Sequence, residues 1–258
     1  MSRPTLLVTG ASAGIGAAVA RMAAARGYDL GLGYRSNREG AEAVQAACEA
    51  AGACAVLLAG DLARAEAVDA VFAAFDSAFP QLDAFVNNAG IVTPKARVEE
   101  MDAARIEALF ATNVTGAFLA ARNAVRRMSP RYGGSGGSIV NISSAAARLA
   151  SPNQYVDYAA SKAAIDILTQ GLAAEVAGDA IRVNGIRPGL IETDIHAKGG
   201  DPDRLARLAP TVPMARAGTA DEVAEAVLWL CSDGARYVTG ATLDVTGGRW
   251  GRGACGRR

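Results

Sequence analysis

Short apolar runs rich in β-formers alternate with longer helical stretches along most of this chain. We expect strands at residues 5–9, 29–34, 53–59, 82–86, 138–142, 180–186 and 242–245. Helices are expected at residues 17–26, 38–51, 64–79, 102–128, 158–177 and 220–232, with irregular or helical structure from 191 to 217. This alternation is typical of an α/β fold. Nothing marks a repeat or an internal boundary, so we expect one domain over residues 1–258.

A glycine-rich loop follows the first strand and opens the first helix. It reads Gly10-Ala11-Ser12-Ala13-Gly14-Ile15-Gly16. Glycines allow the backbone to approach a phosphate, and the free N–H groups of a helix N-terminus favour its negative charge. The spacing G-x-x-x-G-x-G differs from the general dinucleotide fingerprint, and a glycine turn without a ligand is the alternative. Its place after the first strand favours phosphate binding.

The second strand ends where a dinucleotide fold presents the residue that meets the adenosine ribose. That residue is expected to be Tyr34 or Arg35, followed by Ser36. An NAD site typically offers a carboxylate there, whereas a cation accommodates the 2′-phosphate of NADP. Arg35 therefore indicates NADP, and the alternative is an exposed arginine at a helix start.

Two further loops follow the third and fourth strands. They contain Gly60-Asp61-Leu62 and Asn87-Asn88-Ala89-Gly90. Both are expected at the carboxyl edge of the sheet, where open α/β folds bind ligands, although each is also an ordinary turn sequence. Asn113 lies inside a long apolar helical stretch, where it needs hydrogen-bond partners or holds a water beside a site.

Tyr158-Ala159-Ala160-Ser161-Lys162 places a phenol and an ammonium four residues apart on one helix face. A lysine beside a tyrosine favours the phenolate and lowers the pKa of the phenol toward the range of a general acid or base. Tyrosine and lysine also share this spacing on ordinary helices, so the motif indicates a catalytic role only in combination with the other motifs of the chain.

Charge and composition exclude several classes of function. The formal net charge is +0, so no basic field recruits nucleic acid or a membrane surface. His196 is the only histidine, and Cys48, Cys54, Cys231 and Cys255 form no C-x-x-C, so we expect neither a metal site nor a Ser-His-Asp hydrolase. No apolar run approaches the length of a bilayer span, and residues 1–9 do not resemble a signal peptide, so we expect a cytoplasmic protein.

Together these motifs resemble those of the short-chain dehydrogenase/reductase family. The resemblance rests on the segments 9–16, 87–90, 158–162 and 188–189 together with Asn113 and Ser144, and it spans nearly the whole chain. It is strongest toward the sugar-dehydrogenase and 3-oxoacyl-carrier-protein-reductase branches. The resemblance implies a Rossmann-type, doubly wound, seven-stranded parallel sheet, a nicotinamide cofactor and a homo-oligomer, most often a tetramer.

The resemblance also implies roles for individual residues. Tyr158 would be the general acid/base, and Lys162 would lower its pKa and hold the nicotinamide ribose. Ser144 would orient the substrate oxygen, with the adjacent Ser143 as the alternative, and Asn113 would anchor a water in the proton relay. The cofactor would be bound by Gly10, Ser12, Gly14, Ile15, Gly16, Tyr34, Arg35, Ser36, Asp61, Leu62, Asn88, Ala89, Gly90, Pro188, Gly189, Ile191 and Thr193, besides Tyr158 and Lys162.

These observations predict an NADP(H)-dependent oxidoreductase that transfers a hydride between the nicotinamide and a small carbonyl or alcohol. The alternatives are an NAD-dependent sugar or polyol dehydrogenase and, from another class, a non-catalytic NADP-binding regulator. The substrate is expected to meet residues 151–156 and 191–212, the second segment acting as a lid around Gly199-Gly200. The charges there, Asp194, His196, Lys198, Asp201, Asp203 and Arg204, are mixed in sign and name no substrate. The long apolar helices at 102–128 and 156–177 favour a homotetramer.

Overall fold

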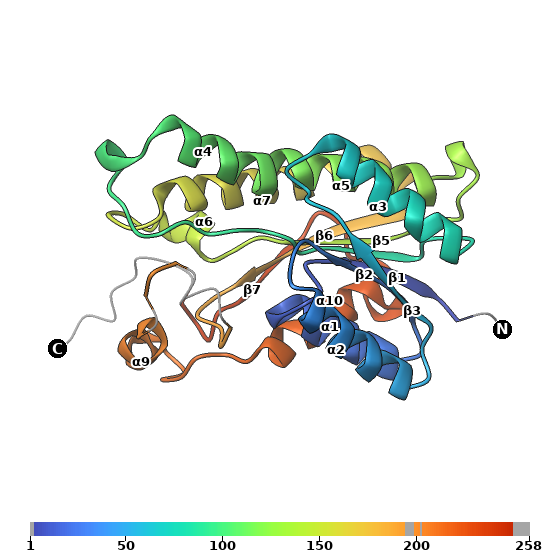
Figure 1. Ribbon diagram of the computed structural model, residues 1–258, viewed down its shortest axis with the longest axis horizontal. Coiled ribbons are helices and arrows are strands. Elements are labelled where there is room, and N and C mark those ends of the chain that lie inside the picture. Colours follow the sequence, from blue (N-terminus) through green and yellow to red (C-terminus); the bar gives the residue numbers. More distant parts are fainter. Residues whose placement is uncertain (1–2, 194–198, 202, 250–258) are drawn as a thin grey trace.

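Seven parallel strands form the sheet around which the computed structural model is built (Figure 1). The structure describes residues 3–193, 199–201 and 203–249. The strand order is β3-β2-β1-β4-β5-β6-β7. The strands are β1 (Thr5–Thr9), β2 (Asp29–Tyr34), β3 (Ala55–Ala59), β4 (Ala84–Asn87), β5 (Gly137–Ile142), β6 (Ile181–Pro188) and β7 (Thr242–Val245). The expected doubly wound seven-stranded sheet is confirmed, because the chain reverses its direction of winding between the neighbours β1 and β4.

Helices cover both faces of the sheet (Figure 1). The helices in the described residues are α1 (Gly14–Ala25), α2 (Arg38–Ala50), α3 (Ala65–Ala78), α4 (Ala103–Phe110), α5 (Ala117–Met128), α6 (Ala146–Leu149), α7 (Val156–Val176), α9 (Arg204–Leu208) and α10 (Ala220–Cys231). Helices α1, α2 and α10 lie below the sheet in the view of Figure 1, and α3, α4, α5 and α7 lie above it.

Each face of the sheet contributes to its own hydrophobic core, because successive strand residues point to opposite faces. Leu6 and Val8 of β1 pack toward the layer of α1 and α10, with Val227 of α10. Leu7, between them, packs with Phe72 and Phe75 of α3 on the other face. Burial on both faces explains why the inner strands are continuous apolar runs in the sequence.

The stretch predicted as one helix over residues 102–128 is interrupted. Helix α4 ends at Phe110, a π-helical turn spans Ala111–Gly116, and α5 begins at Ala117. Asn113 lies in this turn, and its side chain forms hydrogen bonds with Ile91 and Ser161, which lie outside the turn. The prediction of an uninterrupted helix is therefore wrong at the position of the one buried asparagine that the sequence singled out.

Other boundaries differ by a few residues. Helix α1 begins at Gly14, inside the glycine loop, rather than at residue 17, so the loop is part of the helix start. Strand β6 continues to Pro188, and β3 begins at Ala55. Cys255 and three residues of the expected substrate rim, Asp194, His196 and Lys198, lie outside the described residues.

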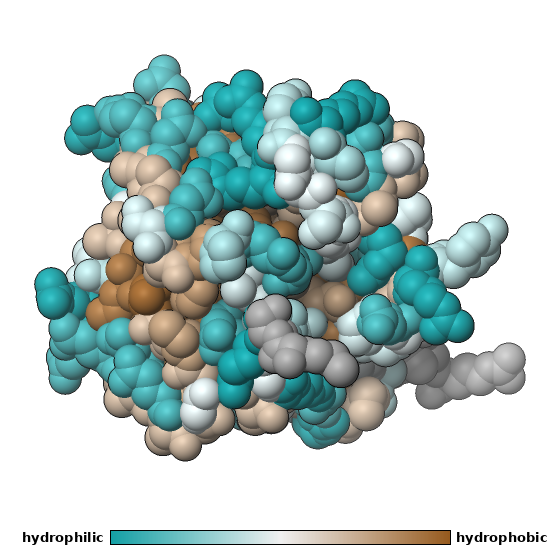
Figure 2. Space-filling model, turned by 90° about the vertical axis from the view of Figure 1, so that its right-hand side faces the viewer, coloured by the Kyte–Doolittle hydropathy of each residue, from teal (hydrophilic) through white to brown (hydrophobic). Residues whose placement is uncertain are grey.

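The face in Figure 2 is mostly hydrophilic, with an apolar area exposed at the left of the view between the upper and lower layers. Within the described ranges, no helix combines the length and the apolar character that crossing a bilayer requires. The strands end on one side of the sheet, and the segments that follow all seven strands contribute to one cleft there.

Candidate active site

A cleft of about 920 Å³ runs along the carboxyl ends of the strands. Its lining includes nearly every residue that the sequence assigned to a cofactor or to catalysis: Gly10, Ser12, Gly14, Ile15, Tyr34, Arg35, Ser36, Asp61, Leu62, Asn88, Ala89, Gly90, Ser144, Tyr158, Lys162, Pro188, Gly189, Ile191 and Thr193. Gly16 and Asn113 do not line it. Segments separated by more than two hundred residues therefore meet at one site.

The glycine loop leaves no room for side chains at its closest approach to α1. A Cβ on Gly16 would lie 2.3 Å from the Gly10 carbonyl oxygen, so Gly16 acts in packing rather than as a lining residue. Gly10 and Gly14 have φ values of +69° and +54°, which favour glycine. Ala13, at the N-cap of α1, provides no side-chain cap, so the first N–H groups of the helix are left for a ligand. This combination fits a bound pyrophosphate.

Thr9 and Asn88 join the loops that follow β1 and β4. The Thr9 hydroxyl oxygen accepts hydrogen bonds from the backbone N–H groups of Asn88 and Ala89, at 2.9 and 3.0 Å. The Asn88 amide donates to the Thr9 and Gly10 carbonyls, at 2.8 and 3.2 Å. These bonds fix the floor of the cleft at the point where the winding of the sheet reverses.

Arg35 lines the cleft just beyond the end of β2, with its side chain exposed. The next cation along the chain differs from it: Arg38 pairs with Glu42 at 2.7 Å, whereas no carboxylate in the described ranges pairs with Arg35. Asn37 caps α2 by accepting from Gly40 N–H at 3.1 Å, so it has a structural role. Arg35 is therefore the guanidinium that remains available to an anionic ligand at this end.

Tyr158, Ser144 and Lys162 meet in the middle of the cleft. The Lys162 ammonium lies 5.8 Å from the centre of the Tyr158 ring. Burial raises the pKa of the Tyr158 phenol, and a hydrogen bond with Ser144 opposes this. Burial lowers the pKa of Lys162 to about 8, against the opposing charge of Asp166.

The sequence predicts that Lys162 lowers the pKa of Tyr158, and the structure differs. The Lys162 ammonium donates to the Ile142 carbonyl at 2.8 Å instead of to the phenol. Desolvation is then the larger influence on the tyrosine. A lowered pKa of Tyr158 would need the ammonium, or another positive charge, to lie closer to the phenol oxygen than it does here.

The two adjacent serines have different surroundings. The Ser143 hydroxyl is buried and donates to the Lys162 carbonyl at 2.9 Å. Ser144 is half-buried, accepts from Ala146 N–H at 3.1 Å and is bonded to Tyr158. This arrangement favours Ser144 as the serine that meets a substrate oxygen, and Ser143 as a support for α7.

Asn113 fastens the wall of the cleft to α7. Its Oδ1 accepts from Ile91 N–H at 2.8 Å, and its Nδ2 donates to the Ile91 carbonyl and to Ser161 Oγ, at 2.9 and 3.2 Å. Both amide hydrogens are thus used within the protein. Ser161, inside the motif of Tyr158 and Lys162, is the partner that the sequence did not indicate.

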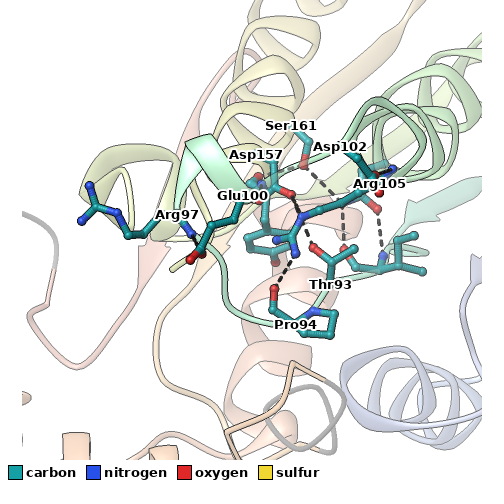
Figure 3. Close-up of polar contacts among 11 residues, drawn as sticks. Thr93, Pro94, Arg97, Glu100, Asp102, Arg105, Asp157 and Ser161 are labelled. Atoms are coloured by element: carbon teal, nitrogen blue, oxygen red, sulfur yellow. Dashed lines mark hydrogen bonds and ion pairs between the residues drawn. The ribbon is translucent and has the colours of Figure 1, made fainter. Parts of the chain in front are cut away.

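A buried ion pair lies at the start of α7, where Figure 3 labels its two members, Asp157 and Arg105. Asp157 and Arg105 are joined by a 2.8 Å contact between Oδ2 and Nε, and the side chain of Asp157 is only 3% exposed. The other carboxylate oxygen of Asp157 accepts from Tyr158 N–H at 2.8 Å. Arg105 also donates to the Pro94 carbonyl at 2.7 Å, so the pair ties α4 and the segment after β4 to the start of α7.

Sequence reasoning missed this pair. Asp157 precedes the tyrosine of the motif and is an acid on an otherwise apolar helix start, which is the only signal it offered. Arg105 lies fifty-two residues earlier, and nothing in the sequence connects the two.

Comparison with known proteins agrees with this geometry. A family model described as enoyl-(acyl carrier protein) reductase matches residues 10–249. The chain is 50% identical over 243 residues to the uncharacterized oxidoreductase YgfF of Escherichia coli K12, covering 94% of this chain and 98% of that protein. It is 41% identical over 249 residues to 3beta-hydroxysteroid dehydrogenase 1 of Eggerthella lenta, covering 95% and 92%.

A solved structure is similar along the whole fold. The 3-ketoacyl-(acyl-carrier-protein) reductase of Brucella melitensis, in complex with NADH, has a TM-score of 0.87 and 31% sequence identity to this chain, covering 95% of this chain and 98% of that one.

Proposed function

The chain belongs to the short-chain dehydrogenase/reductase family and is an NAD(P)-dependent oxidoreductase, and on this premise we propose that it interconverts a small carbonyl compound and its alcohol with NADP(H), using Tyr158 as general acid/base. The observation that carries the proposal is the meeting of Tyr158, Ser144 and Lys162 in the cleft that the glycine loop and Arg35 also line. When bound, the nicotinamide supplies or accepts the hydride.

The protein side chains handle the oxygen and its proton. Ser144 orients the substrate oxygen toward Tyr158, which donates a proton to it in reduction and removes that proton in oxidation. The raised pKa of Tyr158 keeps the phenol protonated near neutral pH, which suits the donor role. Lys162 would hold the ribose of the cofactor, from a position where its ammonium now donates to the Ile142 carbonyl. A water beside Asn113 would extend the proton path from Lys162.

A non-catalytic regulator is the less favoured function. A protein that only senses the nicotinamide pool has no need for a buried lysine, a tyrosine and a serine in contact, and burying the lysine costs stability. Turnover with a panel of ketones, aldehydes and alcohols, measured with both cofactors, tests the choice. Turnover of at least one carbonyl is expected, and cofactor binding without turnover of any of them would support the regulator.

Cofactor preference is proposed from Arg35. We expect NADPH to bind more tightly than NADH, because Arg35 can form charge-assisted hydrogen bonds with the 2′-phosphate. Arg35→Asp is expected to weaken NADPH binding roughly tenfold to a hundredfold, since a contact worth about 1.5–3 kcal/mol becomes a repulsion. Fluorescence titration of both cofactors provides the measurement.

Arg38→Asp is the matched control, because Arg38 is an exposed arginine of the same segment that does not line the cleft. It should leave the ratio of the two affinities within about twofold, as surface charges usually contribute little. Equal affinity of the wild type for the two cofactors would refute the NADP assignment and favour an NAD-dependent sugar or polyol dehydrogenase.

A further inference from the structure

Two arginines line the cleft on the far side of Tyr158 from the glycine loop. Arg204 belongs to α9, and Arg249 follows β7. Both lie in parts of the chain that the family motifs do not include. The sequence left Arg204 among loop charges of mixed sign and attached no role to Arg249.

Arg204 lies against the start of the catalytic helix. Its guanidinium carbon is 5.4 Å from the centre of the Tyr155 ring, and its Nη1 donates to Gln154 Oε1 at 2.8 Å. Tyr155 and Gln154 line the same cleft and precede Tyr158 by only three and four residues. The side chain of Arg204 is 15% exposed, so it is a wall of the cleft rather than a solvated surface charge.

Arg249 also lines this cleft and follows a glycine turn. Gly247 and Gly248 have φ values of +60° and +91° and lie directly against Val212 and Pro213. The Arg249 N–H donates to the Thr246 carbonyl at 3.2 Å, which closes the turn. Both arginines line the same cleft. Burial lowers the pKa of the Arg249 guanidinium, and the positive charge of Arg204 lowers it further.

Among the described residues, the carboxylates that form ion pairs with these arginines and their neighbours do not balance the cations. Asp201 is contacted by Lys95 at 2.7 Å and by Arg207, and Arg204 approaches it at 3.7 Å. One carboxylate thus serves three cations. Among the described residues, no carboxylate forms an ion pair with Arg249. Two half-buried guanidinium groups facing one cleft with so little countercharge are unfavourable unless an anion joins them.

The cofactor phosphates do not account for this positive charge. The phosphate-binding features, the glycine loop and Arg35, follow β1 and β2, whereas Arg249 follows β7. Four inter-strand spacings separate β1 from β7 and five separate β2 from β7, which corresponds to about 19 and 24 Å. An anion bound at Arg249 would therefore be distinct from the cofactor phosphates.

We infer that the substrate carries a carboxylate, which Arg204 and Arg249 bind while Tyr158 and Ser144 meet the reacting oxygen. This inference rests on the proposed function and adds the substrate class to it. The planar guanidinium fork matches a carboxylate in geometry as well as in charge. The apolar residues Leu149, Leu190 and Leu208 line the space between, so the rest of the substrate is expected to be hydrocarbon.

Binding to the cofactor-loaded protein tests the inference without requiring turnover. Cyclohexanecarboxylate and cyclohexanecarboxamide have the same ring and differ in charge. The acid is expected to bind at least about tenfold more tightly by calorimetry, because a charged hydrogen bond replaces a neutral one. Arg249→Gln and Arg204→Gln should each remove most of this difference. Arg207→Gln, a half-exposed arginine of the same helix as Arg204, is the matched control and should retain it.

Turnover gives the second arm of the test. 4-Oxocyclohexanecarboxylate should be reduced with a kcat/KM at least about tenfold above that of its methyl ester, mainly through KM, and this ratio should collapse in Arg249→Gln but persist in Arg207→Gln. Equal binding of acid and amide by the wild type, or an equal loss in all three variants, would overturn the inference.

The two proposals fail in different ways. Selective binding of the acid without turnover of any carbonyl would leave the anion site standing and refute the proposed reaction. Turnover of neutral carbonyls without any preference for the acid would leave the reaction standing and refute the anion site.

Discussion

The burial of the Lys162 ammonium destabilises the fold, and the proposed chemistry requires this ammonium in the cleft. It is 5% exposed, and its nearest acid along the helix, Asp166, forms its own ion pair with Arg187 at 2.8 Å. Burial lowers the pKa of Lys162 from 10.5 to about 8. A positive charge kept in this position without a contacting carboxylate is typical of a functional site rather than of a structural one.

Replacing Lys162 should therefore lower activity while raising the stability of the fold. Lys162→Met is expected to abolish turnover and to weaken cofactor binding, yet to raise the free energy of unfolding at pH 7 by about 1–3 kcal/mol, because a buried charge is removed. Between pH 8 and 10.5 the unfolded wild type binds the extra proton, so wild-type stability rises with pH in that window. The advantage of the variant should shrink there.

Denaturant unfolding of both proteins at pH 7 and pH 10 is the measurement. A variant that is less stable than the wild type at pH 7 would show that Lys162 stabilises the fold, and would contradict the account of its burial.

Among individual residues, those in local sequence motifs could be predicted, whereas partners that are distant in sequence and come together only in the folded chain could not. Tyr158 and Lys162 share a helix face by spacing alone, and Arg35 follows a predictable strand end. The partners of Asn113, Ile91 and Ser161, are distant in sequence, and so is Arg105, the partner of Asp157. The direction of the Tyr158 pKa depends on where the Lys162 ammonium points, which no sequence pattern specifies.

At the scale of elements, the strands were predictable and the interruption of the long helix was not. Inner strands bury both faces, and this requirement produces apolar runs that stand out in the sequence. The residues from Asp102 to Met128 satisfy helical periodicity throughout. The π-helical turn at Ala111–Gly116 arises because Asn113 bonds to Ile91 and Ser161, a tertiary requirement that local periodicity does not encode.

The junction of α4 and α7 provides a test at this scale. Asp157→Asn leaves the Arg105 guanidinium buried without its countercharge, so we expect a loss of about 3–5 kcal/mol in the free energy of unfolding. The double variant Arg105→Met with Asp157→Asn should regain most of that loss, because neither charge then remains unpaired. Chemical denaturation of the wild type, Asp157→Asn, Arg105→Met and the double variant, in a double-mutant cycle, measures the coupling.

Because Asp157 also accepts from Tyr158 N–H, the same cycle reports on positioning. The single variant should lower kcat more than it raises KM, and the double variant should not restore kcat in full. Additive effects of the two substitutions on stability would contradict a coupled pair.

At the scale of the whole molecule, apolar side chains remain exposed on the upper helical layer. Phe118 of α5 is 46% exposed and Ile167 of α7 is 67% exposed, whereas the other large apolar side chains of the two helices are buried or half-buried. Helices α5 and α7 pack together through Ala117, Ala121, Ile165 and Leu168. Exposed apolar side chains on two packed helices are typical of a surface that another subunit covers.

We expect a homotetramer that depends on this surface. Phe118→Glu with Ile167→Glu should shift the protein to smaller species in light scattering at micromolar concentration, because two charges would be buried at the contact. Tyr132→Glu, at an exposed aromatic residue outside α5 and α7, should leave the mass unchanged. A monomeric wild type would refute the expectation.

The proposed mechanism depends on the Tyr158 phenol oxygen, which transfers the proton in catalysis and is not needed for cofactor binding alone. Tyr158→Phe removes only that oxygen, so NADPH should bind within about twofold of the wild type while kcat falls by at least roughly a thousandfold, as expected when the group that transfers the proton is lost. The measurement is turnover on a carbonyl confirmed for the wild type, alongside cofactor titration of the same samples. Loss of turnover with intact cofactor binding is the predicted result, and wild-type turnover by Tyr158→Phe would contradict the mechanism.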